Sequence, residues 1–429
     1  MKKIIALLLA VLMVLSMVAC ASKTTDDTPA DTTPADTTPA DTTTEDTEKT
    51  DEPADTTTDA EPVETDGEYA VAMITDYGDI TDQSFNQTTY EACKAFCEAN
   101  GITFNYFKPA GDNTADRVAM IEKAVDEGYN VIVMPGYAFG GAIVEAAPEY
   151  KDVKFVALDV GKGDLLEAGV AAAGETYDYN PDNWNLEDYV DMSNVYCAIY
   201  QEELCGYMAG YAAVKLGYEK LGFLGGMAVP AVIRYGYGYV QGADAAAQEL
   251  GTNIDINYFY GGQFYGDANI TSRMEGWYSN GTQVVFACGG GIYTSAVEAA
   301  LKNNGYVVGV DVDQNYIGVN GVADGSFAYN PFITSAMKGL TEAVNTALSD
   351  IEAGDWSDIA ASNGNFGLED GDYIGLPTDA DSWNFETFTT DEYEALKSKI
   401  KSGEIVVDNS SDDSTKPTVS EFTTVNYIQ

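Results

Sequence analysis

The chain contains no histidine, and few of its residues carry a positive charge. Without histidine, neither a Ser–His–Asp nor a Cys–His catalytic centre can form, and a His-ligated zinc site is excluded. Lys and Arg number 21 against 69 Asp and Glu, which gives a net charge of −48. Nucleic-acid binding and docking on an anionic membrane both need basic surfaces, so this charge argues against both. The 6 cysteines include no CxxC pair, and we expect no metal site and no cofactor.

Residues 1–20 have the pattern of an export signal. Two lysines precede an apolar run that ends in Met-Val-Ala-Cys. The run is followed by polar sequence and is too short for an ordinary membrane-spanning helix. Its ending resembles a lipobox, in which the signal peptide is cleaved before a cysteine that then carries lipid. We therefore expect a lipoprotein signal peptide with lipidation of Cys20; secretion with an unmodified Cys20 is the alternative.

Residues 21–67 form a low-complexity segment of Thr, Asp, Glu and Pro. Almost nothing in it is large and apolar, so it cannot bury enough surface to offset the entropy of ordering. Its like charges favour an extended chain. We interpret the segment as a disordered tether between a lipid anchor and a folded domain.

From residue 69 onward, short apolar runs rich in β-branched and aromatic residues alternate with amphipathic segments. This alternation predicts an α/β fold of parallel sheets with helices on both faces. The length of 429 residues suits two doubly wound lobes better than one sheet. The expected strands are residues 69–75, 102–107, 131–134, 154–158, 194–199, 220–224, 254–260, 284–287 and 306–310, and the expected helices include residues 115–127, 202–216, 231–250, 292–302 and 332–350.

The loop at residues 76–87 connects the first expected strand to a helical pattern. In open α/β sheets, ligands bind where strands end and helices begin. Asp76 stands at the strand end, and Asp82 or Ser84 is expected to cap the helix. Such a cap leaves the backbone N–H groups of Phe85 and Asn86 as donors. A carboxylate, an aromatic ring and a carboxamide can together hold a flat polar ligand; alternatively, Asp76 caps a turn and Phe85 packs under the helix.

Several other expected strands end in residues that can touch a ligand. Asp159 follows one strand and Asp311 follows another. Glycine and aspartate are common at such turns, so each signal is weak by itself. Together they place carboxylates, aromatic rings and bare backbone at strand ends in both halves of the chain. The remaining candidates are Tyr137 after Pro135-Gly136, Phe264 after Gly261-Gly262-Gln263, the glycines at 289–291 after Cys288, and the cation of Lys338.

Short motifs along residues 69–408 occur in the order of a known family. They are Asp76 with Ser84-Phe85-Asn86-Gln87, Gly136-Tyr137-Ala138-Phe139, Val153-Lys154-Phe155 leading to Asp159, Gly206-Tyr207-Met208-Ala209-Gly210, Leu221-Gly222-Phe223-Leu224-Gly225-Gly226, Gly309-Val310-Asp311-Val312-Asp313-Gln314, Thr334-Ser335-Ala336-Met337-Lys338 and Lys399-Ile400-Lys401-Ser402-Gly403-Glu404-Ile405. By these motifs the chain resembles the basic membrane protein family of lipoproteins, whose members include purine-nucleoside receptors. The name does not suit so acidic a chain, although most of the charge lies outside the motifs.

The resemblance implies a type I periplasmic-binding-protein fold, in which two lobes joined by a hinge close on a ligand. It implies a lipid-anchored, extracytoplasmic substrate-binding protein that captures a nucleoside, with a purine favoured. The partners so implied are the permease subunits of an ABC transporter, and the membrane is contacted through the N-terminal lipid alone. Carried over by motif, the residues facing the cleft are Asp76, Phe85, Asn86 and Asp159 from the first lobe, Phe264, Gly290 and Asp311 from the second, and Lys338 near the hinge; Tyr235 competes with Phe264, and Gly289 with Gly290.

The substrate-binding domain is expected at residues 68–408. Its first lobe comprises about 68–200 and 321–350, its second lobe about 201–320, and 351–408 pack on the lobes. Residues 409–429 are interpreted as a polar tail.

The stretch at 160–194 is longer than the family's usual connection. Its residues 178–188 faintly resemble a calcium loop but lack the required glycine and glutamate, so a solvated insertion is favoured. The cysteines beyond Cys20 are interpreted as small buried hydrophobes, and one disulfide is the alternative.

Two other functions stay open at this point. The fold does not determine the ligand, so a sugar or another small polar compound could replace the nucleoside. A surface adhesin or sensor that has kept the fold would suit the long tether and the abundant tyrosine. The cleft motifs keep their polar residues, which favours binding. Nothing favours an enzyme, because the chain has no histidine, no nucleophile elbow and no metal-ligand cluster.

Overall fold

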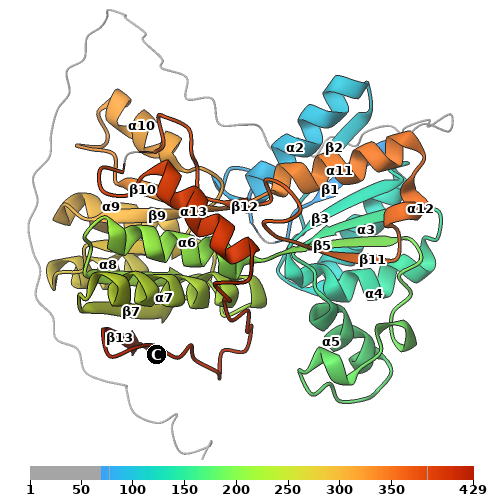
Figure 1. The fold of residues 1–429 in the computed structure, drawn as a ribbon. Helices are drawn as coiled ribbons and strands as arrows, with labels where there is room; N and C mark the ends of the chain where they lie inside the picture. Colours follow the sequence, from blue (N-terminus) through green and yellow to red (C-terminus); the bar gives the residue numbers. More distant parts are fainter. Residues whose placement is uncertain (1–68, 77, 384) are drawn as a thin grey trace, which may run out of the picture. The chain divides into compact units, whose positions relative to one another are not determined.

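The structure, a computed structural model, describes residues 69–76, 78–383 and 385–429, which form two α/β lobes (Figure 1). The expected signal peptide, Cys20 and the tether lie outside the described residues. Across the described ranges, no helix combines the length and the apolar character needed to span a bilayer.

The first lobe is built on a 6-stranded sheet of order β11-β5-β4-β3-β1-β2. All neighbouring strands in it are parallel, as the alternation of strands and helices predicts. Helices α2 and α11 pack together on one face, and α3, α4 and α5 follow one another on the other (Figure 1). The elements are β1 (Ala70–Ile74), α2 (Phe85–Asn100), β2 (Thr103–Phe107), α3 (Thr114–Asp126), β3 (Val131–Pro135), α4 (Gly140–Glu149), β4 (Lys154–Leu158), α5 (Lys162–Ala172), β5 (Val195–Tyr200), α11 (Leu340–Ala353), α12 (Trp356–Ile359) and β11 (Ser362–Phe366).

The second lobe is built on a 7-stranded sheet of order β12-β10-β9-β8-β6-β7-β13, in which β12 alone is antiparallel to its neighbour. Helices α6 and α7 pack very closely because glycines lie at their contact. A Cβ on Gly242 would lie 1.9 Å from the carbonyl oxygen of Tyr207. The elements are α6 (Glu202–Lys215), β6 (Lys220–Gly225), α7 (Pro230–Leu250), β7 (Ile254–Tyr260), α8 (Ala268–Ser279), β8 (Val284–Cys288), α9 (Tyr293–Asn303), β9 (Tyr306–Asp311), α10 (Asn315–Asp324), β10 (Phe332–Lys338), β12 (Ile374–Gly375), α13 (Thr390–Lys401) and β13 (Thr423–Tyr427).

The chain passes between the two sheets three times. The first hinge crossing joins β5 to α6, the second joins β10 to α11, and the third joins β11 to β12. The backbone N–H of Gln201 donates to the carbonyl of Phe366 at 2.9 Å, and that of Gly339 donates to the carbonyl of Tyr373 at 2.7 Å. The third crossing is therefore hydrogen-bonded to both of the others, and the three form one hinge.

The expected helix at residues 332–350 is wrong in its first part. Phe332–Lys338 is strand β10, which pairs in parallel with β9, and α11 begins only at Leu340. Residues 321–350 were also expected to belong to the first lobe as a whole, but they are divided between the two lobes. Strand β10 belongs to the second sheet, whereas α11 packs against α2 of the first lobe. The nine expected strands are all present, as β1 to β9.

The interpretation of residues 409–429 as a polar tail also needs correction. Strand β13 pairs in parallel with β7, from Thr423 beside Ile254 to Tyr427 beside Tyr258. The carboxylate of Asp244 accepts hydrogen bonds from the N–H and hydroxyl of Ser420 at 3.0 and 2.6 Å. The C-terminal segment thus completes the second sheet.

The long connection between β4 and β5 is held together by aromatic side chains. The rings of Tyr177 and Trp184 lie 5.8 Å apart, and those of Trp184 and Tyr189 lie 5.5 Å apart. Asp178, the first residue of the calcium-like stretch, accepts hydrogen bonds from Trp184 and Asn183 at 2.7 Å each.

The cysteines of the described residues are all buried and unpaired, which confirms that they pack as small hydrophobes: Cys93, Cys97, Cys197, Cys205 and Cys288.

Candidate functional site

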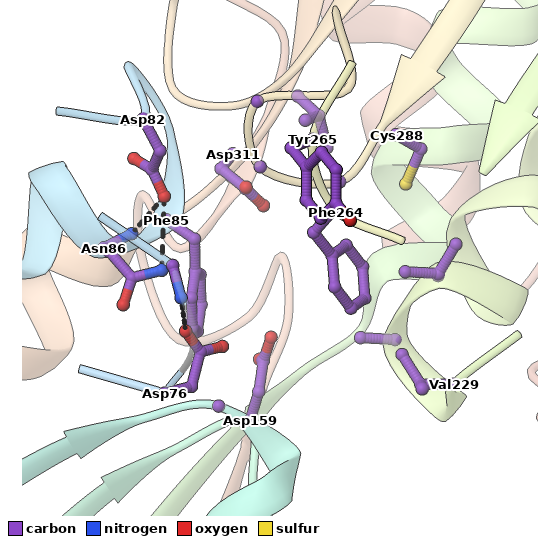
Figure 2. Close-up of a pocket in the computed structure, with 18 of the residues that line it drawn as sticks. Asp76, Asp82, Phe85, Asn86, Asp159, Val229, Phe264, Tyr265, Cys288 and Asp311 are labelled. Carbon is purple, nitrogen blue, oxygen red and sulfur yellow. Dashed lines mark hydrogen bonds between the residues drawn. The ribbon is translucent and has the colours of Figure 1, made fainter. Parts of the chain in front are cut away.

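A cavity of about 420 Å³ is lined by residues from both lobes (Figure 2). Its walls include the carboxyl ends of β8, β9 and β10 in the second lobe and the loops after β1, β3 and β4 in the first. The structure brings every ligand-binding residue expected from the sequence to this one cavity: Asp76, Phe85, Asn86, Asp159, Phe264, Gly290, Asp311 and Lys338. The competing candidates Tyr235 and Gly289 line it as well.

Asp82 caps helix α2 at the cavity wall. Its carboxylate accepts hydrogen bonds from the backbone N–H groups of Asn86 and Gln87 at 3.0 and 3.1 Å, and from the Asn86 carboxamide nitrogen at 3.2 Å. The expected free N–H at Asn86 is therefore occupied. The Oδ1 atom of Asn86 is buried and has no hydrogen-bond partner among the described residues. Burial raises the pKa of Asp82 to about 6, although these N–H donors oppose the rise.

Ser84 bridges the two lobes instead of capping the helix. Its hydroxyl donates to Asp311 Oδ2 at 2.6 Å, from the loop after β1 to the end of β9. Gln83 lies beside it with a φ of 57°. The backbone carbonyl of Gln83 accepts a hydrogen bond from Gln314 Nε2 at 3.0 Å, and its side-chain oxygen accepts one from Tyr316 OH at 2.7 Å. These three bonds join the loop after β1 in the first lobe to the end of β9 and the segment after it in the second, and we call this bridge beside the cavity the rim.

Asp159 and Asp311 occupy equivalent places in the two lobes. One follows β4 and the other ends β9, and both have a left-handed backbone with φ of 59° and 67°. Such a φ is uncommon for a residue with a side chain and is found where the surrounding structure demands it, often at functional sites. Both carboxylates form ion pairs with Lys338. The sequence placed these two residues correctly because each is the first polar group after a buried strand.

Lys338 lines the cavity at the end of β10, and only 3% of its side chain is exposed; we call its position the floor of the cavity. Its ammonium is hydrogen-bonded to Asp159 Oδ2 and lies 3.7 Å from Asp311 Oδ1 and 3.6 Å from Glu202 Oε1. Burial alone would lower the pKa of Lys338, but the carboxylates raise it above its usual value. Burial raises the pKa of Asp159 to about 6 against the opposing effect of Lys338, and it also raises the pKa of Asp311.

Two phenylalanine rings face the cavity from opposite sides (Figure 2). Phe85 comes from the first lobe; it is only 9% exposed, and the Lys338 ammonium lies 4.7 Å from the centre of its ring. Phe85 thus packs in the core and lines the cavity at once, so both interpretations of this residue apply. Phe264 comes from the second lobe, where a Cβ on Gly289 would lie 2.7 Å from its ring. Gly289 and Gly290 therefore leave space for Phe264.

Glu202 is a polar residue of this site that sequence reasoning missed. It is fully buried at the start of α6, and its Oε2 accepts from Arg234 Nε at 2.7 Å. Its partners Lys338 and Arg234 are distant in sequence, so no local pattern reveals the pairing. The one available signal is its position two residues after the end of strand β5, next to a second glutamate, Glu203.

The chain matches the family described as ABC transporter substrate-binding protein PnrA-like over residues 69–411. Among curated proteins, it is 27% identical over 293 residues to the ABC transporter nucleoside-binding protein BmpA of Lactococcus lactis subsp. cremoris, covering 65% of this chain and 73% of that one. It is 28% identical over 353 residues to the CD4+ T-cell-stimulating antigen of Listeria innocua, covering 79% and 88%. A solute-binding protein of an ABC transporter from Aeropyrum pernix K1 has a similar structure, with a TM-score of 0.62, 21% identity and coverage of 81% and 95%.

The family match, together with two lobes, three hinge crossings and a cavity between strand ends, defines a substrate-binding protein of the type I periplasmic-binding-protein fold, which confirms the predicted fold. Proteins of this class bind small ligands and act with the permeases of ABC transporters. The chain belongs to the family of PnrA-like ABC transporter substrate-binding proteins, also named basic membrane proteins, as its motifs predicted.

Proposed function

We propose that this chain is a lipid-anchored receptor on the extracytoplasmic face of the cell membrane that binds a nucleoside, preferably a purine nucleoside, and delivers it to an ABC transporter. One observation supports the nucleoside most directly. Two aromatic rings face each other across a cavity in which buried oxygen acceptors have no partner among the described residues. The nucleoside-binding name of the Lactococcus relative supports the same ligand class.

The aromatic rings suit a flat base. Phe85 and Phe264 can stack on the two faces of a purine, which is the arrangement that aromatic pairs favour. A cavity of about 420 Å³ lies within the usual range for small-molecule sites. A purine presents a π-face to each ring, so the second ring adds to the stacking that a base gains.

The polar groups suit the edge of a base and a ribose. Asn86 Oδ1 and Asp159 Oδ1 are buried acceptors that a ligand N–H or O–H can satisfy. Asp76 and Asp311 offer further carboxylates for ribose hydroxyls. A wrong ligand that leaves one such group unpaired loses about 1–3 kcal/mol, which supplies selectivity.

Closure and delivery follow from contacts with both lobes. A ligand that touches Phe85 and Phe264 together binds the closed arrangement better than an open one, so it shifts the population towards closure. In our proposal the permease recognises the closed form, and a lipid on Cys20 with residues 21–67 as tether keeps the receptor near it.

A thermal-shift experiment on the purified protein tests the ligand class. Inosine, guanosine, adenosine, uridine, ribose and glucose are added separately in excess. A ligand at a hundred times its Kd adds about 2.7 kcal/mol of apparent stability, which is easily seen. We expect at least one purine nucleoside to raise the Tm, and Phe85→Leu to abolish the rise.

Phe96→Leu is the matched control, because Phe96 lies on the same helix α2 but not on the cavity wall. It should leave the nucleoside response intact. A response to a sugar alone would refute the nucleoside while keeping the binding protein. No response to any compound would favour the adhesin or sensor.

A further inference from the structure

Glu202 and Lys338 each lie on a hinge crossing. Glu202 begins α6 directly after the first crossing, and Lys338 ends β10 directly before the second. Their side chains are 0% and 3% exposed, and their charged atoms are 3.6 Å apart. The ion pair therefore joins two of the three segments about which the lobes move.

The charges around Lys338 come from every side of the hinge. Asp159 approaches from the first lobe, Asp311 from the second, and Glu202 from the crossing itself. Two carboxylates are already more than enough to balance one ammonium. The third carboxylate is held by Arg234 of α7, and its Oε1 makes no hydrogen bond within the described residues. Burying a charge is costly unless it is paired, and the ion pair with Lys338 at 3.6 Å offsets that cost at this oxygen, as Arg234 does at the other.

We propose that Glu202 is a positioning residue, which holds the Lys338 ammonium at the cavity floor and couples ligand occupancy to the hinge. The proposal rests on the proposed function, in which Lys338 and Asp159 meet the ligand. Glu202 does not line the cavity, so it acts on the ligand only through these two residues.

The negative charge of Glu202 affects the pKa of two neighbouring carboxyl groups, which a merely structural role would not do. It is one of the charges that raise the pKa of Asp159 and of Asp311. A ligand N–H or O–H binds the carboxylate form of Asp159, so affinity is full above the pKa and falls as the pH drops through it. Glu202→Gln removes one negative charge and shifts this acid limb to lower pH. The charged groups facing Asp159 are Lys338 of β10, Asp311 of β9, Glu202 of α6, Arg234 of α7 and Asp164 of α5, with Tyr200 of β5 beside them.

Calorimetric titration of the purified protein with its strongest nucleoside between pH 4.5 and 8 tests the proposal. We expect Glu202→Gln to weaken binding by roughly 2- to 30-fold at pH 7.5, the range typical of residues coupled to a site without touching the ligand. We also expect its acid limb to lie at lower pH than in the wild type.

Glu203→Gln is the matched control. Glu203 is the next residue in the same turn of α6, is also buried, and forms no ion pair with Lys338 among the described residues. It should keep both the affinity and the acid limb. Equal behaviour of the two variants would overturn the proposal. If Glu202→Gln does not fold, Glu202→Asp replaces it, and unchanged affinity in that variant would overturn the proposal.

A ligand-free measurement separates this proposal from the proposed function. NMR titration of the Asp159 carboxyl in the free protein should show a lower midpoint in Glu202→Gln than in the wild type and in Glu203→Gln. If no nucleoside binds any form, the proposed function fails, and the midpoint still decides whether Glu202 controls the charge of Asp159. An unshifted midpoint would overturn the positioning role.

Discussion

Lys338→Met tests whether the buried ammonium holds the site together. Methionine keeps a similar length but removes the charge. Glu202 keeps Arg234 and Asp311 keeps Ser84, whereas Asp159 loses its hydrogen-bonded cation. Its other oxygen already lacks a partner within the described residues. The variant therefore leaves a buried carboxylate unpaired.

The expected magnitude follows from this geometry. Breaking a buried ion pair by removing one partner costs about 3–5 kcal/mol, and the three carboxylates around Lys338 place this variant within that range near neutral pH. The loss depends on pH. The pKa of Asp159 is already raised to about 6 by burial, and losing Lys338 raises it further. A carboxyl with a higher pKa in the folded state binds more protons there, so the variant gains stability as the pH falls from 7.5 towards 4.

Urea unfolding at pH 7.5 and pH 5.5, followed by tryptophan fluorescence, measures the free energy of unfolding. The difference between variant and wild type should shrink at pH 5.5, by at most about 1.4 kcal/mol per pH unit for one carboxyl. Lys302→Met is the control, because Lys302 forms exposed ion pairs with Glu275 and Glu298 and should change little. A loss below about 1 kcal/mol at pH 7.5, or a loss that grows on acidification, would refute the reasoning.

Two further predictions concern the rim and the C-terminal strand. Ser84→Ala removes the hydroxyl that donates to Asp311 across the lobes, and a hydrogen bond to a charged group contributes about 1.5–3 kcal/mol. Small-angle scattering of the ligand-free protein should therefore show a larger radius of gyration, and an unchanged radius would contradict the bridge. Ending the chain at Pro417 removes β13 and bares the edge of β7; we expect a lower Tm and self-association that increases with concentration, as light scattering can show, because an open strand edge pairs readily. A truncated chain that keeps its Tm would mean that β13 adds nothing to the second sheet.

Strands β10 and β13 are among those that sequence reasoning missed, and each was hidden for a different physical reason. Strand β10 is buried along nearly its whole length, so it shows no alternation, and it runs almost directly into the periodic pattern of α11. Strand β13 has the opposite problem, since it is a short edge strand of mixed polarity. Both became visible only through their partners β9 and β7.

Some of the polar contacts of the site could be predicted from the sequence, and others could not. Asp159 and Asp311 could be predicted because a polar residue directly after a buried strand must lie at the carboxyl edge of its sheet. The pairing of Ser84 with Asp311, and of Glu202 with Lys338, could not be predicted, because each joins segments far apart in the sequence. The sequence allowed either Asp82 or Ser84 as the cap of α2, and the structure shows that Asp82 caps it.

The sequence by itself determined the α/β class, nine of the strands and the candidate residues at strand ends, because hydrophobic periodicity and turn chemistry are local properties of the chain. The resemblance to the family then selected the residues expected to face the cavity. The family motifs added the order of these pieces. Only the tertiary structure decided which charges share the Lys338 ammonium, how the lobes join at the rim and which segment completes the second sheet. These depend on long-range packing in a low-dielectric interior, where partners are set by the closure of the whole fold.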